Sequence, residues 1–251
     1  MPLDLMLPER VVVTGGASGI GLACARLFHS AGAQVGMVGR SPERLVAARE
    51  SLGGGAHTAI ADVGDEHAIT GAIDELAAAM GGVDALVVSA GIDGEMGASV
   101  RDVTAQGFRE VLDVNVLGAF LAVRAALPRL ELSVSPSVTL VGSDSGFVAV
   151  PGMLAYNASK GAIVQLTRAL AVELYDQYGI RVNSVAPSVV DTPMARRGLG
   201  DAIMDAPDFP LQSPEDVAWS VAYLSSARAR AINGTTLLSD FGYTGRSSFP
   251  A

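Results

Sequence analysis

The chain has 251 residues, of which 49% are hydrophobic and 17% charged, and this composition predicts one packed α/β domain rather than a disordered chain. Its formal net charge of -9 argues against nucleic acid or an anionic membrane as a partner, because both would repel the protein. Cys24 is the only cysteine, which excludes an internal disulfide, and neither a signal peptide nor an uninterrupted membrane-spanning run is recognisable, so we expect a cytoplasmic protein.

Short apolar runs rich in β-branched residues recur along the chain and predict strands. Longer amphipathic or alanine-rich stretches lie between them and predict helices. This alternation is typical of a parallel sheet with helices on both faces. In chain order, the expected strands cover residues 10–14, 34–38, 58–60, 84–89, 137–142, 181–185 and 235–238.

Right-handed crossovers between these strands give a doubly wound parallel sheet of about seven strands, a Rossmann-type fold that binds ligands beyond the C-terminal strand ends. We find no repeat and no linker, so residues 1–251 are expected to form a single domain. Residues 188–212 contain three prolines and are either a substrate lid or a long surface loop, and their length favours the lid. The expected helices cover residues 19–31, 42–52, 65–80, 105–132, 154–178 and 214–225.

A glycine-rich turn, residues 14–21 with the sequence TGGASGIG, joins the first strand to the first helix. Glycines at this place let the backbone turn tightly and approach a pyrophosphate, which the helix N-terminus then stabilises. A glycine turn without a ligand is the alternative. The position between strand and helix favours a dinucleotide site.

The end of the second strand bears on the choice of dinucleotide. An acid there would bond the ribose hydroxyls, but the chain has Gly39 followed by Arg40 and Ser41, so NADP(H) is favoured and NAD(H) remains the alternative. Arg40 is otherwise a solvated residue, and Ser41 a helix cap. Asp62, after the third strand, either accepts from the adenine amino group or caps the following helix.

Tyr156 and Lys160 lie four residues apart in a predicted helix, so their side chains share one face. A nearby ammonium favours phenolate and lowers the pKa of a tyrosine, which suits it for proton transfer. Lys160 is the only lysine among 17 basic residues. Random placement would put it four residues after a tyrosine only about once in fifty.

Two further polar residues lie near this pair in the predicted fold. Ser143 follows the fifth expected strand, where its hydroxyl either donates to a substrate oxygen or caps a turn. Asn115 lies inside an expected helix, where asparagine is unfavourable unless its side chain has a partner. A satisfied core amide is the alternative for Asn115.

Together these residues resemble the short-chain dehydrogenase/reductase family over residues 11–242. The resemblance implies that Tyr156 exchanges a proton, Ser143 orients the carbonyl, Lys160 lowers the tyrosine pKa and binds ribose, and Asn115 holds a relay water. It implies no metal ion. It also implies that the cofactor contacts Gly15, Ser18, Gly19, Ile20, Gly21, Arg40, Ser41, Asp62, Val63, Ser89, Ala90, Gly91, Tyr156, Lys160, Pro187, Val190 and Thr192.

The chain departs from the family pattern in three places. Val88-Ser89 stands where two asparagines are common, Ser188 replaces a glycine after Pro187, and 239–242 replaces an acidic-glycine-glycine ending. None of these changes removes a catalytic group.

The expected function is therefore hydride transfer between NADP(H) or NAD(H) and a ketone or secondary alcohol. A cofactor-binding sensor without turnover is the alternative, although it would not need all four polar residues. Residues 92–96, 147–154 and 189–211 are the candidate pocket walls, and their apolar side chains indicate a small apolar substrate or ordinary packing. A homo-oligomer, a tetramer or a dimer, is expected.

Overall fold

The computed structural model describes residues 5–246, which form a seven-stranded parallel sheet in the order β3-β2-β1-β4-β5-β6-β7. Every expected strand is present, with ends displaced by at most two residues. The strand order reverses between β1 and β4, so the ligand crevice of a doubly wound fold lies beyond the C-terminal ends of these strands. The strands are β1 (Arg10–Thr14), β2 (Gln34–Gly39), β3 (His57–Ile60), β4 (Ala85–Val88), β5 (Ser137–Val141), β6 (Arg181–Pro187) and β7 (Thr236–Ser239).

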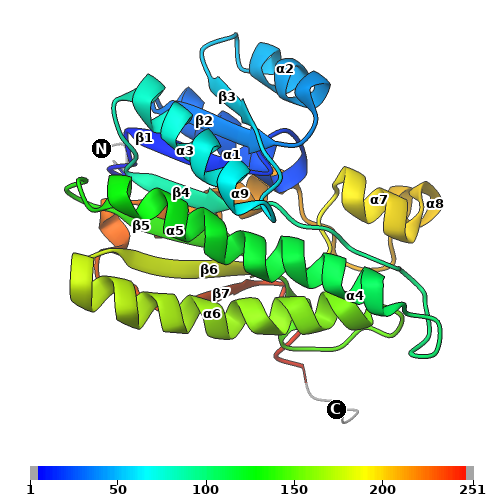
Figure 1. Ribbon diagram of the computed structural model, residues 1–251. Helices are drawn as coiled ribbons and strands as arrows, with labels where there is room; N and C mark the ends of the chain where they lie inside the picture. The colour runs from blue at the N-terminus through cyan, green and yellow to red at the C-terminus, as the bar shows by residue number, and fades with distance from the viewer. Residues whose placement is uncertain (1–4, 247–251) are drawn as a thin grey trace.

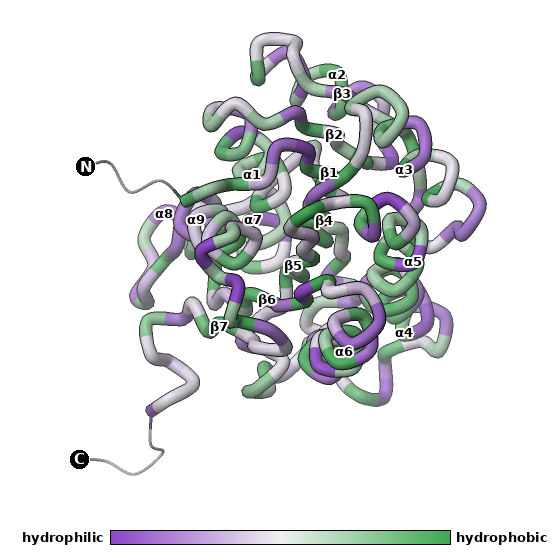
Figure 2. Tube along the Cα trace, turned by 90° about the vertical axis from the view of Figure 1, so that its left-hand side faces the viewer, coloured by the Kyte–Doolittle hydropathy of each residue, from purple (hydrophilic) through white to green (hydrophobic). Residues whose placement is uncertain are grey.

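Helices cover both faces of the sheet (Figures 1 and 2). Buried residues of α3, α5 and α6 pack on one face, and those of α1, α2 and α9 pack on the other. The helices are α1 (Gly19–Ser30), α2 (Pro42–Ser51), α3 (Glu66–Met80), α4 (Ala105–Leu112), α5 (Gly118–Leu130), α6 (Leu154–Tyr178), α7 (Pro193–Leu199), α8 (Asp201–Asp205) and α9 (Pro214–Ser225).

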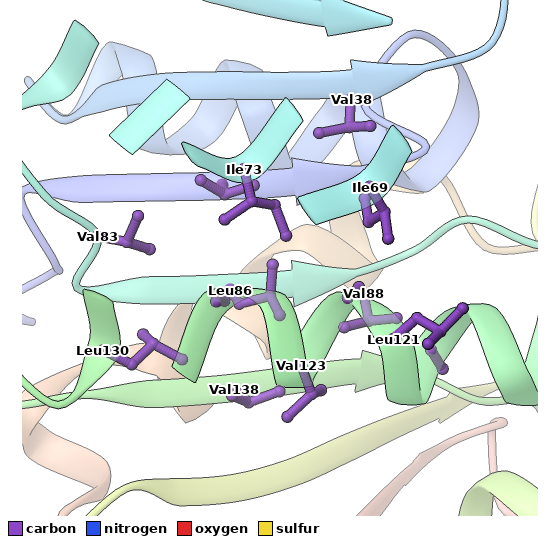
Figure 3. Packing of buried hydrophobic residues seen from close by; sticks show 14 of the residues in the cluster. Val38, Ile69, Ile73, Val83, Leu86, Val88, Leu121, Val123, Leu130 and Val138 are labelled. Carbon is purple, nitrogen blue, oxygen red and sulfur yellow. The ribbon is translucent and has the colours of Figure 1, made fainter. Parts of the chain in front are cut away.

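Each central strand supplies both cores because successive side chains point to opposite faces. Figure 3 shows one of these cores, where Leu86, Val88 and Val138 from the sheet meet Ile73 from α3 and Leu121 from α5. Both faces of β1 and β4 are buried, which explains why residues 11–13 of β1 and all of β4 are apolar instead of alternating with polar residues. The hydrophobic cores on the two faces of the sheet hold the strands in place, and the site lies at the ends of these strands.

The helix expected over residues 105–132 is present as one continuous run over Ala105–Leu130, but its middle is not α-helical, which the sequence did not predict. Between α4 and α5 the chain forms a π-helical turn, η1 (Asp113–Leu117), whose centre is the buried Asn115. Such a turn widens the helix by one residue and often occurs at functional sites. Here it directs the Asn115 side chain toward the end of β4.

By length and composition alone, Ala105–Leu130 could cross a membrane. However, 50% of its apolar window is buried inside the protein, where Leu121 and Val123 join the core beside α3. Core helices of globular proteins meet the same criterion. Packing therefore accounts for the apolar character of this segment.

Residues 188–212 contain the two short helices α7 and α8, so they are not an irregular surface loop. Figure 1 shows both helices beside the carboxyl ends of the strands. The base of the segment is closed by a parallel bridge between Val190 and Gln212. Gln212 is buried, and its amide donates to the backbone and side-chain oxygens of Ser239, each at 2.7 Å.

The guanidinium of Arg196 holds this segment together at the surface. It pairs with Asp191 at 2.7 Å, with Asp201 at 3.3 Å and with Asp205 at 2.8 Å. The three carboxylates, above all Asp191, raise the pKa of Arg196. One side chain on α7 therefore links the start of the segment to α8.

Candidate active site

The glycine turn after β1 packs directly against the end of β4. Gly15 has a φ of +66°, and a Cβ at this position would lie 2.9 Å from the backbone N and Cα of Ala90. A Cβ on Gly21 would overlap the carbonyl oxygen of Gly15. The Thr14 hydroxyl oxygen accepts from the backbone N–H of Ser89 at 3.2 Å and of Ala90 at 3.3 Å. Any side chain at these glycines would therefore force the turn open.

The N-terminus of α1 fits an anion. Ser18 is the N-cap residue, and within the part of the chain that the structure describes its side chain makes no capping bond and the first turn carries no acid. The N–H groups of the first turn, at Gly19 and Ile20, are therefore available to a phosphate. Gly19 has a φ of +51°, and a Cβ there would lie 3.2 Å from Thr192, which brings α7 beside this turn.

Arg40 lies at the end of β2, where the structure pairs it with Asp62. The closest nitrogen–oxygen distance is 3.5 Å, and the two side chains are 62% and 46% exposed. An ion pair this open contributes little free energy, so a phosphate can compete for the guanidinium. Asp62 also accepts from the backbone N–H of Gly64 at 2.9 Å.

Two capping questions left open by the sequence are now answered. Ser41 caps α2 by accepting from the backbone N–H of Arg44 at 3.2 Å. Asp62 does not cap the following helix, because Asp65 does so by accepting from Ala68 at 3.0 Å. Asp62 is thus left beside Arg40 at the end of β3, next to the buried Val63.

Tyr156 and Lys160 lie in the first two turns of α6, as the sequence predicts. The ammonium nitrogen of Lys160 is 5.4 Å from the centre of the Tyr156 ring. It donates to the backbone carbonyl of Val141, the last residue of β5, at 3.0 Å. Lys160 is buried, and burial lowers the pKa of its ammonium to about 8.

The Tyr156 phenol has the opposite shift. Burial raises its pKa to about 12, a hydrogen bond with the Ser143 side chain lowers it, and the carboxylates of Asp144 and Asp93 raise it further. The phenol is therefore protonated at neutral pH. A positive charge brought close to the hydroxyl would lower this pKa.

Ser143 stands at the end of β5, immediately before the 3₁₀ turn η2 (Asp144–Gly146). Its hydroxyl oxygen accepts from the backbone N–H of Ser145 at 3.1 Å, and its proton is donated to Asp144 at 3.0 Å. The turn-capping alternative is thus correct. The interaction of this hydroxyl with a substrate oxygen stays a prediction.

The Asn115 side chain is fully engaged. Its amide oxygen accepts from the Ile92 N–H at 2.8 Å, and its amide nitrogen donates to the Ile92 carbonyl at 2.9 Å and to Ser159 at 3.0 Å. The amide oxygen also lies beside Gly91, where a Cβ would be 3.3 Å from it and 4.0 Å from the Lys160 nitrogen. Asn115 is therefore a satisfied buried amide that ties η1 to the segment after β4 and to α6.

The expected cofactor residues after β6 lie at the C-terminal edge of the sheet, as do those after β1 and β4. Pro187 is the last residue of β6, Val190 is buried at the base of 188–212, and Thr192 caps α7 by accepting from Ala195 at 3.2 Å. This segment lies beside the glycine turn, because a Cβ at Gly19 would be 3.2 Å from the Thr192 side chain.

Two residues of the site, Ser159 and Asp144, were not predicted as members of it, and Asp93 was expected only as part of the pocket wall at 92–96. Ser159 bonds Asn115, and Asp144 and Asp93 act on Tyr156. Ser159 lies three residues after Tyr156, so helical spacing could have indicated it. Asp144 directly follows Ser143, but no pattern in the sequence shows where its carboxylate points.

Comparisons with known proteins agree with this geometry. A family model described as enoyl-(acyl carrier protein) reductase matches residues 15–244. The chain is 36% identical over 244 residues to a 2-(R)-hydroxypropyl-CoM dehydrogenase of Xanthobacter autotrophicus (strain ATCC BAA-1158 / Py2), covering 93% of this chain and 97% of that one. It is 33% identical over 250 residues to an NADP-dependent (R)-specific alcohol dehydrogenase of Lentilactobacillus kefiri, covering 96% and 98%.

Solved structures give the same result. A short chain dehydrogenase/reductase family protein superposes with a TM-score of 0.84 at 35% identity, covering 97% of this chain and all of that one. A 3-ketoacyl-(acyl-carrier-protein) reductase from Brucella melitensis complexed with NADH superposes with a TM-score of 0.87 at 30% identity, covering 94% and 98%. The chain belongs to the short-chain dehydrogenase/reductase family and is an NAD(P)-dependent oxidoreductase of alcohol and carbonyl groups.

Proposed function

We propose that this chain transfers hydride between NADP(H) and a ketone or secondary alcohol, with Tyr156 as the general acid/base. The observation that carries the proposal is the convergence of Tyr156, Lys160 and Ser143 beyond the C-terminal end of β5. These groups come from two elements and meet where a doubly wound sheet binds ligands.

Each side chain has a role that follows from its contacts. The nicotinamide, when bound, supplies or accepts the hydride. Reduction leaves charge on the carbonyl oxygen, and Tyr156 donates the proton that neutralises it. Lys160 favours the phenolate in the reverse direction and donates to ribose hydroxyls. Ser143 hydrogen-bonds the substrate oxygen after leaving its present partner.

Asn115 has a different role from that of a direct ligand. Its amide is already bonded to Ile92 and Ser159, so a relay water beside Lys160 would have to be held by its backbone carbonyl. A π-helical turn of this kind often occurs at a functional site. We therefore assign Asn115 to the proton path through its backbone.

The cofactor residues proposed are those of the glycine turn, the ends of β2 and β3, the segment after β4 and the start of 188–212. Gly39 in place of an acid and the weakly paired guanidinium of Arg40 support NADP(H) over NAD(H). Ser41 keeps its capping bond to α2, and its hydroxyl follows Arg40 directly at the end of β2.

Residues 188–212 are proposed as a lid within one catalytic domain of residues 1–251. The base of this segment is fixed by the Val190–Gln212 bridge, whereas its outer part is held by surface ion pairs of Arg196. Exposed ion pairs contribute little, so the outer part can open without unfolding the base. Residues 92–96 and 147–154 would form the other walls of a small substrate pocket.

A homo-oligomer, a tetramer or a dimer, is proposed as the working unit in the cytoplasm. Large apolar side chains are exposed on two faces: Phe120, Val172 and Tyr175 on α5 and α6, and Trp219 and Leu238 on α9 and β7. Apolar patches of this kind are usually covered in symmetric assemblies.

The direct test is turnover. When purified protein is mixed with NADPH and a panel of small ketones, the absorbance of NADPH should fall. When it is mixed with NADP+ and secondary alcohols, the same absorbance should rise. NADH is compared in parallel. Binding of NADPH without turnover of any ketone or alcohol would contradict the proposal and favour a sensor.

A further inference from the structure

The three candidate walls of the substrate pocket meet at Met96 and Gly97. The backbone N–H of Gly97 donates to the carbonyl of Gly152 at 2.9 Å, and a Cβ on Gly152 would lie 2.9 Å from the Gly97 Cα. One residue earlier, the terminal methyl group of Met96 would lie 3.0 Å from a Cβ on Gly198 of α7. The segment after β4 therefore touches both the chain leading into α6 and the helix α7 of the proposed lid.

The part of this segment before Met96 is anchored without any help from α7. Ile92 exchanges two hydrogen bonds with the Asn115 amide, at 2.8 and 2.9 Å. The Glu95 carboxylate accepts from the backbone N–H and from the hydroxyl of Thr104, each at 2.9 Å, at the N-terminus of α4. Met96 directly follows these anchors, so it belongs to a fixed wall of the pocket.

The helix α7 reaches from the cofactor turn to this wall. Its N-cap Thr192 lies beside Gly19, and Gly198 lies beside Met96 six residues later, a distance of about 9 Å along a helix. Figure 1 shows α7 beside the carboxyl ends of the strands, where the segment after β4 leaves the sheet. The outer part of α7 is held by the surface ion pairs of Arg196, which contribute little free energy. The movable helix therefore rests on the fixed wall at Met96.

The two residues in contact suit a lid that closes on a wall. Met96 has an unbranched, apolar and half-buried side chain, and a thioether adapts its shape to the surface that it meets. Gly198 has no side chain, so the methyl group of Met96 comes close to the backbone of α7. A contact between apolar groups here closes the pocket on the side away from the glycine turn.

We propose that Met96 is a specificity-determining residue: by carrying the end of α7 it closes the substrate pocket and limits the substrate to small apolar ketones and secondary alcohols. The inference rests on the proposed function and adds the size class of the substrate. It has two consequences. Without the Met96 side chain, α7 opens more readily, and the pocket accepts bulkier ketones.

Limited digestion with trypsin measures the opening of α7 without any substrate. Arg196 and Arg197 lie in α7, and mass spectrometry identifies cleavage after either of them. Met96→Ala should be cut there about three- to tenfold faster than the wild type, because cleavage follows the population of the open segment. Met96→Leu keeps an apolar contact with Gly198 and should be cut at a rate within about twofold of the wild type.

Ketones of two sizes measure the limit on the substrate. The quantity is kcat/KM for para-tert-butylacetophenone divided by kcat/KM for butanone, at saturating NADPH. Met96→Ala should raise this ratio at least about tenfold, chiefly through a lower KM for the bulky ketone, because space for a single methylene already changes discrimination by about that factor. Met96→Leu should leave the ratio within about threefold of the wild type.

Val100→Ala is the matched control. Val100 is an apolar residue of the same connection between β4 and α4, but its side chain is 77% exposed. Its truncation should change neither the cleavage rate nor the ratio by more than about twofold, as is usual for a surface substitution. An equal effect in this control would mean a general loosening of the loop and would overturn the proposal.

The outcomes separate this inference from the proposed function. A wild type that reduces no ketone of either size contradicts the proposed function, and the size limit fails with it, while trypsin still decides whether Met96 holds α7. If the wild type reduces butanone and Met96→Ala changes neither measurement, only the inference about Met96 fails. Faster cleavage with an unchanged ratio overturns the specificity role. So does a wild type that reduces the bulky ketone as efficiently as butanone.

Discussion

Lys160 is held to the end of β5 by its bond to the Val141 carbonyl, with its ammonium 5.4 Å from the centre of the Tyr156 ring. A helix residue is thus tethered to the strand that carries Ser143 at its end. This tether explains how α6 and β5 keep a fixed distance at the site. It also buries a positive charge, which costs free energy and lowers the pKa of Lys160 to about 8.

The buried ammonium predicts a pH dependence of stability. The pKa of Lys160 falls from its ordinary 10.5 to about 8 on folding, so between these values the unfolded chain binds more protons than the folded one. Lys160 therefore destabilises the fold below pH 8, and this penalty is relieved as the pH rises toward 10.5. The difference in unfolding free energy between wild type and Lys160→Met should rise by about 1–3 kcal/mol from pH 7 to pH 10.

Urea unfolding at four pH values measures this difference. The pKa of Tyr156 is raised to about 12 on folding, so this residue makes the unfolding free energy fall with pH, but only above its ordinary pKa of 10. It therefore does not disturb the window from pH 8 to 10. A difference that stays flat from pH 7 to 10 would contradict a buried ammonium.

Arg40→Ala tests the cofactor preference. Loss of a charged hydrogen bond should weaken NADP(H) binding by roughly 2–3 kcal/mol and leave NAD(H) binding nearly unchanged. Dissociation constants from titration of the reduced cofactors, followed by their fluorescence, provide the measurement. Asp62→Asn is informative beside it, because it frees Arg40 from its ion pair but keeps an oxygen that can accept from the cofactor, so it should not weaken NADP(H) binding. Equal losses for both cofactors in Arg40→Ala would refute the preference.

Asn115→Ala should destabilise the protein. The substitution leaves the N–H and carbonyl of Ile92 without their partner in a buried place, at a cost of about 1–3 kcal/mol for an unsatisfied buried group. Gln106→Ala, at an exposed pair with Glu110, is the control and should change stability by less than about 0.5 kcal/mol. If both variants unfold at the same urea concentration as the wild type, the structural role of Asn115 is wrong.

Light scattering at micromolar concentration should give a dimer or tetramer mass. Trp219→Asp and Val172→Asp place charges on the two exposed apolar faces and should lower that mass, each through a different interface. A wild-type protein that elutes with the mass of one chain would show that these faces are not subunit contacts.

The strands and the pair formed by Tyr156 and Lys160 could be predicted because their signals are local. Residues 11–13 of β1 and all of β4 form short apolar runs, and the spacing from Tyr156 to Lys160 places both on one helical face. The π-helical turn at Asp113–Leu117 could not be predicted, because the apolar pattern of the helix continues through it. Only the contacts of Asn115 with Ile92 and Ser159 distinguish this turn from the rest of the helix.

The helices α7 and α8 were missed for a similar reason. They are short, and Arg196 holds them through three carboxylates that are up to nine residues away along the chain. Short helices of this kind show no reliable periodicity. The bond from Ser143 to Asp144 likewise depends on the turn geometry of η2 and not on residue spacing.

The central claim is that Tyr156 exchanges the proton that accompanies hydride transfer. Tyr156→Phe keeps the ring and its packing but deletes the hydroxyl, so the fold and the cofactor affinity should be retained. The most direct measurement is the single-turnover rate of hydride transfer from NADPH to a ketone that the wild type reduces, under conditions where chemistry limits the rate. The account predicts a loss of about 10²–10⁴-fold in this variant. A rate close to that of the wild type would contradict it.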